Sequence, residues 1–173
     1  KYTTLDSNLF IRNRELLSRK LDNKSIAIFN SNDVMPTNSD GTMPFKQNSD
    51  LFWLTSVDQE ESVFVMIKHN DLIKEILFLK ETNEHIAIWE GAKLTKDKAN
   101  KNSGIQQVYW LTEMEKIIHN EIIGLEKIYL NKNMHSRSTS EVQTRDDRFR
   151  ETMISQFPNK EIKEIAPIMH ELR

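Results

Sequence analysis

Apolar and polar positions follow one another along the chain in short blocks that predict a mixture of helices and strands. A helix is expected from about Asp6 to Leu21, where Leu9, Leu16 and Leu17 recur at helical spacing. The uninterrupted apolar run Ser25–Phe29 predicts a strand buried on both faces. The basic side chains of the first helix lie mostly off its apolar stripe: Arg12, Arg14, Arg19 and Lys20.

The stretch from Asn30 to Asp50 has neither helical nor strand periodicity. It contains turn-forming Asn, Ser and Asp residues, two prolines and the turn signal Asp40-Gly41. A loop of about twenty residues is uncommon inside a compact domain and usually has a function. Because methionines and a phenylalanine interrupt the polar residues, the sequence predicts an ordered, functional loop.

Two strands are predicted after this loop. Leu51–Thr55 and Ser62–Lys68 are apolar and are separated by the acidic turn 58–61, so a β-hairpin is expected. Further extended segments are expected at Lys74–Lys80, His85–Trp89, Lys127–Leu130 and Glu161–Ile165. Helical segments are expected within Lys93–Gly104, at Leu111–Ile123 and from Ala166 onward.

One more helix is predicted near residue 140. Ser138 and Glu141 have the spacing of a capping box, and Pro158 ends the helix. Asp146 and Arg150 are expected to pair on the solvent side, four positions apart. Its inward-facing side chains are expected to be Val142, Phe149, Met153 and Phe157. Together these elements predict one α/β domain with a mixed β-sheet flanked by helices.

Composition excludes several functions. A formal charge of −2 gives no basic footprint for nucleic acid, and no apolar run approaches the ~20 residues that span a membrane. The absence of cysteine excludes thiolate chemistry and suits a cytoplasmic location. Four glycines are too few for a phosphate-binding loop or a dinucleotide fingerprint.

No catalytic constellation is visible in the residues themselves. The five histidines show no i, i+3 or i+4 pair, no G-x-S-x-G motif is present, and the acidic turn 58–61 is expected to be solvated. Two features remain without an explanation. They are the long loop and Trp89, which stands in Ile88-Trp89-Glu90-Gly91. For the tryptophan, a place at the rim of the core and a binding role both stay open.

These two features carry a resemblance. Pro44–Thr55, PFKQNSDLFWLT, with the acidic turn and the strand after it, resembles the N-terminal domain of Xaa-Pro aminopeptidases (aminopeptidase P). Arg12 and Arg14, the I-W-x-G stretch and the closing P-x-x-H-E-L-R match in the right order, so the resemblance covers nearly the whole chain. Ser56 departs from it, because the family often has glycine there.

The resemblance implies a ribonuclease-H-like fold of the creatinase and aminopeptidase P N-terminal type. Residues 1–173 would form this non-catalytic domain, and the C-terminal pita-bread catalytic domain would be absent from the chain. The parent enzyme would use two divalent metal ions, usually manganese, to release the N-terminal residue from peptides with proline second. The chain itself would hold no metal or other cofactor and would not act as an enzyme alone.

The resemblance also implies partners and site residues. The domain would contact its own C-terminal catalytic domain, support a homo-oligomer (a dimer or tetramer) and help to wall the active site against proline-containing peptides. Asp40 matches an acidic loop residue that faces the catalytic domain, and Trp89 matches an aromatic that leans toward a neighbouring subunit's substrate cleft. No nucleic acid or membrane is expected as a partner. A prolidase- or creatinase-type parent, or a non-enzymatic protein-binding module, remains the alternative.

Overall fold

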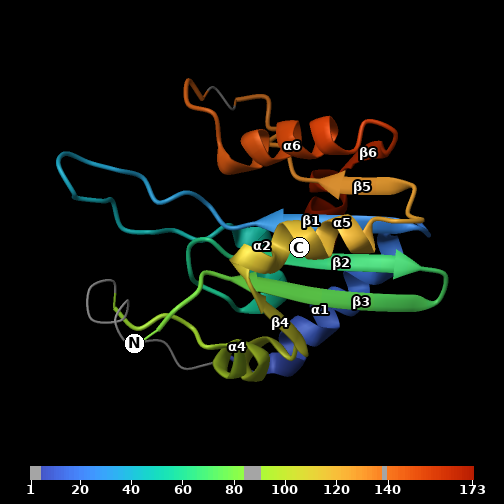
Figure 1. Ribbon diagram of the computed structural model, residues 1–173, viewed down its shortest axis with the longest axis horizontal. Helices are drawn as coiled ribbons and strands as arrows, with labels where there is room; N and C mark the ends of the chain where they lie inside the picture. Colours follow the sequence, from blue (N-terminus) through green and yellow to red (C-terminus); the bar gives the residue numbers. More distant parts are fainter. Residues whose placement is uncertain (1–4, 84–90, 138–139) are drawn as a thin grey trace.

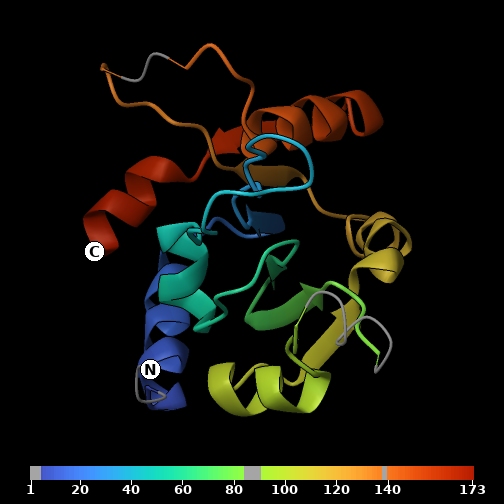
Figure 2. The same cartoon turned by 90° about the vertical axis from the view of Figure 1, so that its left-hand side faces the viewer.

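The computed structural model describes residues 5–83, 91–137 and 140–173, and it shows a six-stranded sheet between two layers of helices (Figures 1 and 2). In chain order the elements are α1 (Ser7–Lys20), β1 (Ser25–Asn30), α2 (Ser49–Thr55), β2 (Val63–His69), β3 (Leu72–Leu79), α4 (Lys96–Ser103), β4 (Gln107–Trp110), η1 (Leu111–Glu113), α5 (Met114–Glu121), β5 (Lys127–Leu130), α6 (Arg145–Gln156), β6 (Glu161–Glu164) and α7 (Ala166–Leu172). The extended run predicted at His85–Trp89 lies outside the described residues.

The sheet is mixed, as the sequence predicts, with the strand order β4-β3-β2-β1-β5-β6. β1, β2 and β3 pair in antiparallel fashion, while β5 runs parallel to both β1 and β6, and β4 runs parallel to β3. Because β1 and β5 run in the same direction, their carboxyl ends lie at one edge of the sheet (Figure 1). The chain therefore brings the residues after two buried strands together at that edge.

Each face of the sheet has its own apolar core. In β1, Ala27 and Phe29 pack under α1, α2, α4 and α7, whereas Ile26 and Ile28 pack under α5 and α6. All four side chains are buried, which explains why β1 is apolar throughout rather than alternating.

The strand expected at Leu51–Thr55 is wrong, because this segment is the helix α2. The side chain of Asn48 accepts hydrogen bonds from the backbone N–H groups of Asp50 and Leu51, which caps the first turn. Leu51 and Leu54 are buried at helical spacing, and Ser56 ends the helix at a positive φ of 63°. The predicted hairpin is therefore also wrong: β2 pairs with β1 and β3.

The start of α6 also differs from the prediction. The helix begins at Arg145, where Thr144 and Asp147 form the capping box that was expected six residues earlier. Val142 precedes the helix and is 62% exposed instead of facing inward. Asp146 does not pair with Arg150. The short strand β4 was not predicted either.

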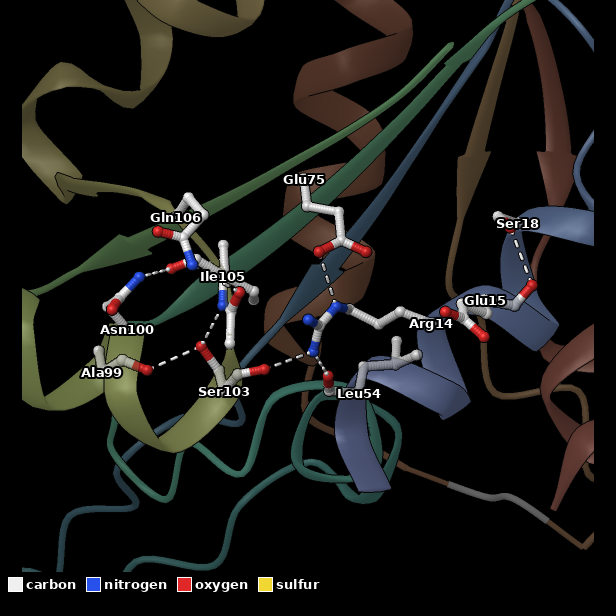
Figure 3. A network of polar contacts seen from close by, with 11 residues as sticks. Arg14, Glu15, Ser18, Leu54, Glu75, Ala99, Asn100, Ser103, Ile105 and Gln106 are labelled. Carbon is white, nitrogen blue, oxygen red and sulfur yellow. Dashed lines mark hydrogen bonds and ion pairs between the residues drawn. The ribbon is translucent and has the colours of Figure 1, made fainter. Parts of the chain in front are cut away.

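Arg14 is buried although the sequence pattern of α1 places it off the apolar stripe. Its side chain is only 1% exposed, and its Nη1 donates to the carbonyl oxygens of Leu54 (2.8 Å) and Ser103 (2.9 Å) (Figure 3). Both oxygens lie in the last turn of a helix, where backbone carbonyls lack a helical partner and favour a cation. Arg14 therefore joins α1 to the ends of α2 and α4.

Candidate functional site

A groove lies at the carboxyl ends of β1 and β5, with a volume of about 590 Å³. Its walls are the loop after β1, the connection between β5 and α6, the first turns of α2 and α6, and part of α7. The carboxyl ends of parallel strands are a common place for a ligand or partner site in sheets of this class. This groove is therefore the candidate functional site.

The groove is lined by a half-buried carboxylate, that of Asp146. Asp146 accepts hydrogen bonds from the side-chain amides of Asn30 (3.1 Å) and Asn131 (2.9 Å), the residues that end β1 and follow β5. Burial raises the pKa of Asp146 above its ordinary value, and the two amides oppose that rise only in part. Asp146 thus fixes the start of α6 to both strand ends.

A second carboxylate, Asp50, lies in the first turn of α2. Its Oδ1 is 3.1 Å from Nη1 of Arg173, which follows α7. Burial raises the pKa of Asp50, while the charges of Arg173 and His170 lower it. The charge of Asp50 also raises the pKa of Asp146. The groove therefore holds two carboxylates that are easier to protonate than ordinary aspartates.

Arg145, the first residue of α6, also lines the groove and is half-buried. Among the described residues its side chain has no hydrogen bond and no ion pair. Burial lowers the pKa of Arg145, and the charges of Glu61 and Asp33 oppose this lowering. Neither is an ion-pair partner of Arg145, since Asp33 pairs with Arg148 at 2.7 Å and Glu61 pairs with Lys80 at 3.9 Å.

The long loop is ordered, as the sequence predicts. An isolated β-bridge joins Pro36 to Thr42, and the backbone N–H of Met43 donates to the carbonyl of Met35 at 2.8 Å. At its base, the Gln47 side chain donates to two backbone carbonyls in the turn after α2. Figure 1 shows the loop reaching well beyond the edge of the sheet.

Of the two predicted site residues, only Asp40 lies among the described residues. Asp40 is exposed in the turn at the tip of the loop and does not line the groove. Trp89 lies outside the described residues. Sequence reasoning missed Asp50, Arg145 and Asp146. One signal was available, since a polar asparagine follows or ends each of the apolar strands β1 and β5.

The described residues offer no metal centre. Among residues 5–83, 91–137 and 140–173, no group of three or more His, Cys, Asp or Glu side chains could hold an ion. The four histidines in these ranges, His69, His119, His135 and His170, are all exposed. The two half-buried carboxylates of the groove are engaged by amides and by an arginine instead. In the same ranges, no helix has the length and hydrophobicity to span a membrane.

A family model and two curated relatives agree on the kind of protein to which this chain is similar. Residues 10–129 match the family model described as "Aminopeptidase P, N-terminal domain". The chain is similar to the Xaa-Pro aminopeptidase of Escherichia coli (strain K12), with 26% identity over 121 residues that cover 69% of this chain and 27% of that protein. It is also similar to the mitochondrial Intermediate cleaving peptidase 55 of Arabidopsis thaliana, with 25% identity over 168 residues. These residues cover 95% of this chain and 31% of that protein.

Solved structures show the same fold. The chain superposes on a Bacillus anthracis protein assigned as an aminopeptidase P with a TM-score of 0.89 and 25% identity, covering 98% of this chain and 40% of that one. The low-pH form of E. coli aminopeptidase P gives a TM-score of 0.82 at 20% identity, and the superposition covers 99% of this chain and 39% of that one. The chain thus spans less than half the length of these relatives.

Proposed function

Because the chain belongs to the family of aminopeptidase P N-terminal domains, we propose that it is the non-catalytic domain of a metal-dependent Xaa-Pro aminopeptidase. Such an enzyme releases the N-terminal residue from peptides with proline in second position. The observation that carries this proposal is the match of residues 10–129 to the family model, supported by a TM-score of 0.89 over 98% of the chain.

In this proposal the domain positions and encloses chemistry that takes place elsewhere in the protein. Its own described residues contain no cluster of side chains that could hold a metal ion. Two divalent ions, manganese by the family resemblance, are held by the catalytic domain. The described residues do not fit such ions, so no step of the reaction is assigned to them.

The domain's contribution is to wall the active site and to support a homo-oligomer. Asp40 supports the first role, because it is exposed on a loop that projects from the edge of the sheet (Figure 1). Trp89 is proposed to face a neighbouring subunit's substrate cleft. An indole offers a flat apolar surface against a proline ring at little cost in conformational entropy.

The test uses the full-length protein loaded with manganese and three peptides. We expect release of the first residue from Xaa-Pro-Xaa, none from the matched Xaa-Ala-Xaa, and loss of activity on chelation that added manganese reverses. Cleavage of the Xaa-Pro dipeptide alone would instead indicate a prolidase-type parent. If the manganese-loaded protein cleaves no peptide, the proposal of an aminopeptidase is overturned.

A further inference from the structure

The outer edge of β3 is open at its start. β4 pairs with β3 only from Ile76 to Leu79, so Leu72–Glu75 have no strand on that side among the described residues. This stretch lies at the end of the sheet opposite the groove, because β2 runs antiparallel to β1 and β3 begins where β2 ends (Figure 1). An open strand edge is a template on which another extended segment can pair.

The register of the sheet shows which backbone groups of this edge face outward. The N–H of Ser31 donates to the carbonyl of Ser62, so β2 bonds to β1 through its even-numbered residues and to β3 through its odd-numbered ones. By the antiparallel register, β3 then bonds to β2 through its own even-numbered residues. The N–H and C=O of Ile73 and the N–H of Glu75 therefore point away from β2, and no backbone hydrogen bond joins them to residues 91–106.

A hollow of about 380 Å³ lies beside this edge, between α1, the start of β3 and the link from α4 to β4. Its charged lining residues are Arg14, Glu15, Lys74 and Glu75. Glu75 pairs with Arg14 at 2.9 Å (Figure 3), and Lys74 pairs with Glu121 on α5. Glu15 is exposed, and among the described residues its side chain has no ion pair and no hydrogen bond. The carboxylate of Glu15 is therefore available to a cationic group.

We propose that Leu72–Glu75 bind an extended segment of another protein as an added strand, with a lysine or arginine side chain directed into the hollow toward Glu15. Main-chain hydrogen bonds to Ile73 and Glu75 supply affinity, and the carboxylate selects the basic side chain. On the other face of the sheet, Leu72 is 76% exposed and offers the added strand an apolar contact. The site is separate from the proposed peptidase activity and does not depend on it.

A second copy of the chain fits this edge poorly. Two copies that pair symmetrically run antiparallel, with outward-facing residues opposite each other. Because β4 blocks one end and the turn after β2 blocks the other, the pairing is centred on Ile73 or on Lys74. The first register sets Glu75 opposite Asp71 of the other copy, and the second sets the two Lys74 side chains opposite each other. Like charges directly opposite destabilise a strand pair, which favours a different partner.

Hydrogen exchange of single amides in the full-length protein tests the open edge. Without a partner, the N–H of Ile73 should exchange at least about tenfold faster than the N–H of Lys74, which bonds to β2. Slow exchange of Ile73 at every protein concentration would show that the molecule itself covers the edge. Slow exchange that is lost on dilution would assign the edge to a second copy. Either result overturns the proposal.

Binding is tested with the blocked peptide acetyl-TVKVT-amide at about 5 mM, a concentration suited to a short, weak ligand. The peptide contains no proline, and acetyl-TVEVT-amide is the matched control. The lysine peptide should slow exchange of the Ile73 and Glu75 amides at least about threefold, and the glutamate peptide should slow it less. No slowing by the lysine peptide overturns the added strand, and equal slowing by both peptides overturns the charge preference.

Two variants locate the contacts. Ile73→Pro removes an outward N–H without breaking a bond to β2, so the protein should fold and the lysine peptide should no longer slow exchange at Glu75. Glu15→Gln should reduce the effect of the lysine peptide to that of the glutamate peptide. Glu115→Gln, at an exposed position of α5, is the matched control and should leave binding unchanged. Equal binding of the lysine peptide by the two glutamine variants would overturn the role given to Glu15.

Discussion

Nε of Arg14 lies 2.9 Å from Oε2 of Glu75, so an ion pair joins α1 to β3 beside two hydrogen bonds from the same guanidinium (Figure 3). Replacing Arg14 by methionine should lower the free energy of unfolding by about 3–5 kcal/mol, because it leaves two helix ends and a carboxylate without their cation. Chemical denaturation of the domain measures this loss. Arg12→Met, at an exposed position of the same helix, should change stability by less than about 0.5 kcal/mol. Similar values for the two variants would contradict the role of Arg14.

The cap of α2 gives a second prediction. Asn48→Ala should cost about 1 kcal/mol of stability, because it removes the acceptor for the N–H groups of Asp50 and Leu51. Asn120→Ala, at an exposed position of α5, is the control and should be neutral or slightly stabilising. A neutral result at Asn48 would show that tertiary packing alone holds this helix.

The raised pKa of Asp146 predicts a pH dependence. The folded state binds the proton of Asp146 more tightly than the unfolded state, in which the pKa of this group is near 3.8. The contribution of Asp146 to the free energy of unfolding therefore falls as pH rises above 3.8. Asp146→Asn removes the titration. Wild type should therefore lose stability relative to this variant between pH 4 and pH 7. Denaturation of both proteins at several pH values measures the difference, and a constant difference would contradict the assignment.

Asp22 should show the opposite sign. Its carboxylate lies 2.9 Å from Nζ of Lys127 and 2.7 Å from Nζ of Lys163, and these hydrogen bonds lower its pKa. The stabilisation is complete above the unfolded pKa near 3.8 and is lost as pH falls through the lowered folded value. Because the side chains are partly exposed, Asp22→Asn should cost only about 1 kcal/mol at pH 7. The cost should shrink below pH 4 and in high salt; a cost that grows there would contradict the ion pairs.

Trp89→Ala separates a binding role from a structural one. We expect a loss of kcat/KM for Xaa-Pro peptides in the full-length protein, with a stability cost well below the ~3–5 kcal/mol of a core tryptophan. Mixing this variant with a catalytically inactive subunit that keeps Trp89 should restore activity if the indole acts across the subunit boundary. A large stability loss with unchanged kinetics would assign Trp89 to the core.

The strands of the sheet were largely predictable from the sequence, and α2 was not. β1 and β5 are apolar runs bounded by polar residues. This pattern is expected for a strand whose two faces are both covered by helices. The run from Leu51 to Thr55 has the same composition, and at this length a buried strand and a short buried helix cannot be told apart by periodicity. The cap at Asn48 was the deciding local signal.

The groove could not be predicted because its residues meet only through the topology of the sheet. Asp146 is joined to Asn30, 116 positions away in the chain, and the sequence carries no mark of that pairing. The burial of Arg14 could not be predicted for a similar reason. The pattern of α1 shows which side chains leave the apolar stripe, but not that the ends of two other helices supply acceptors for one of them.

The pairing of β1 with both β2 and β5 has a consequence for the order in which the chain can fold during synthesis. β1, β2 and β3 form an antiparallel meander that can pair once Leu79 has left the ribosome. The second edge of β1 finds its partner only when Lys127–Leu130 follow. Until then a nascent chain carries a buried-type strand with one open edge, the feature that most favours pairing with another chain. This interval is the period in which a chaperone would act on the growing protein.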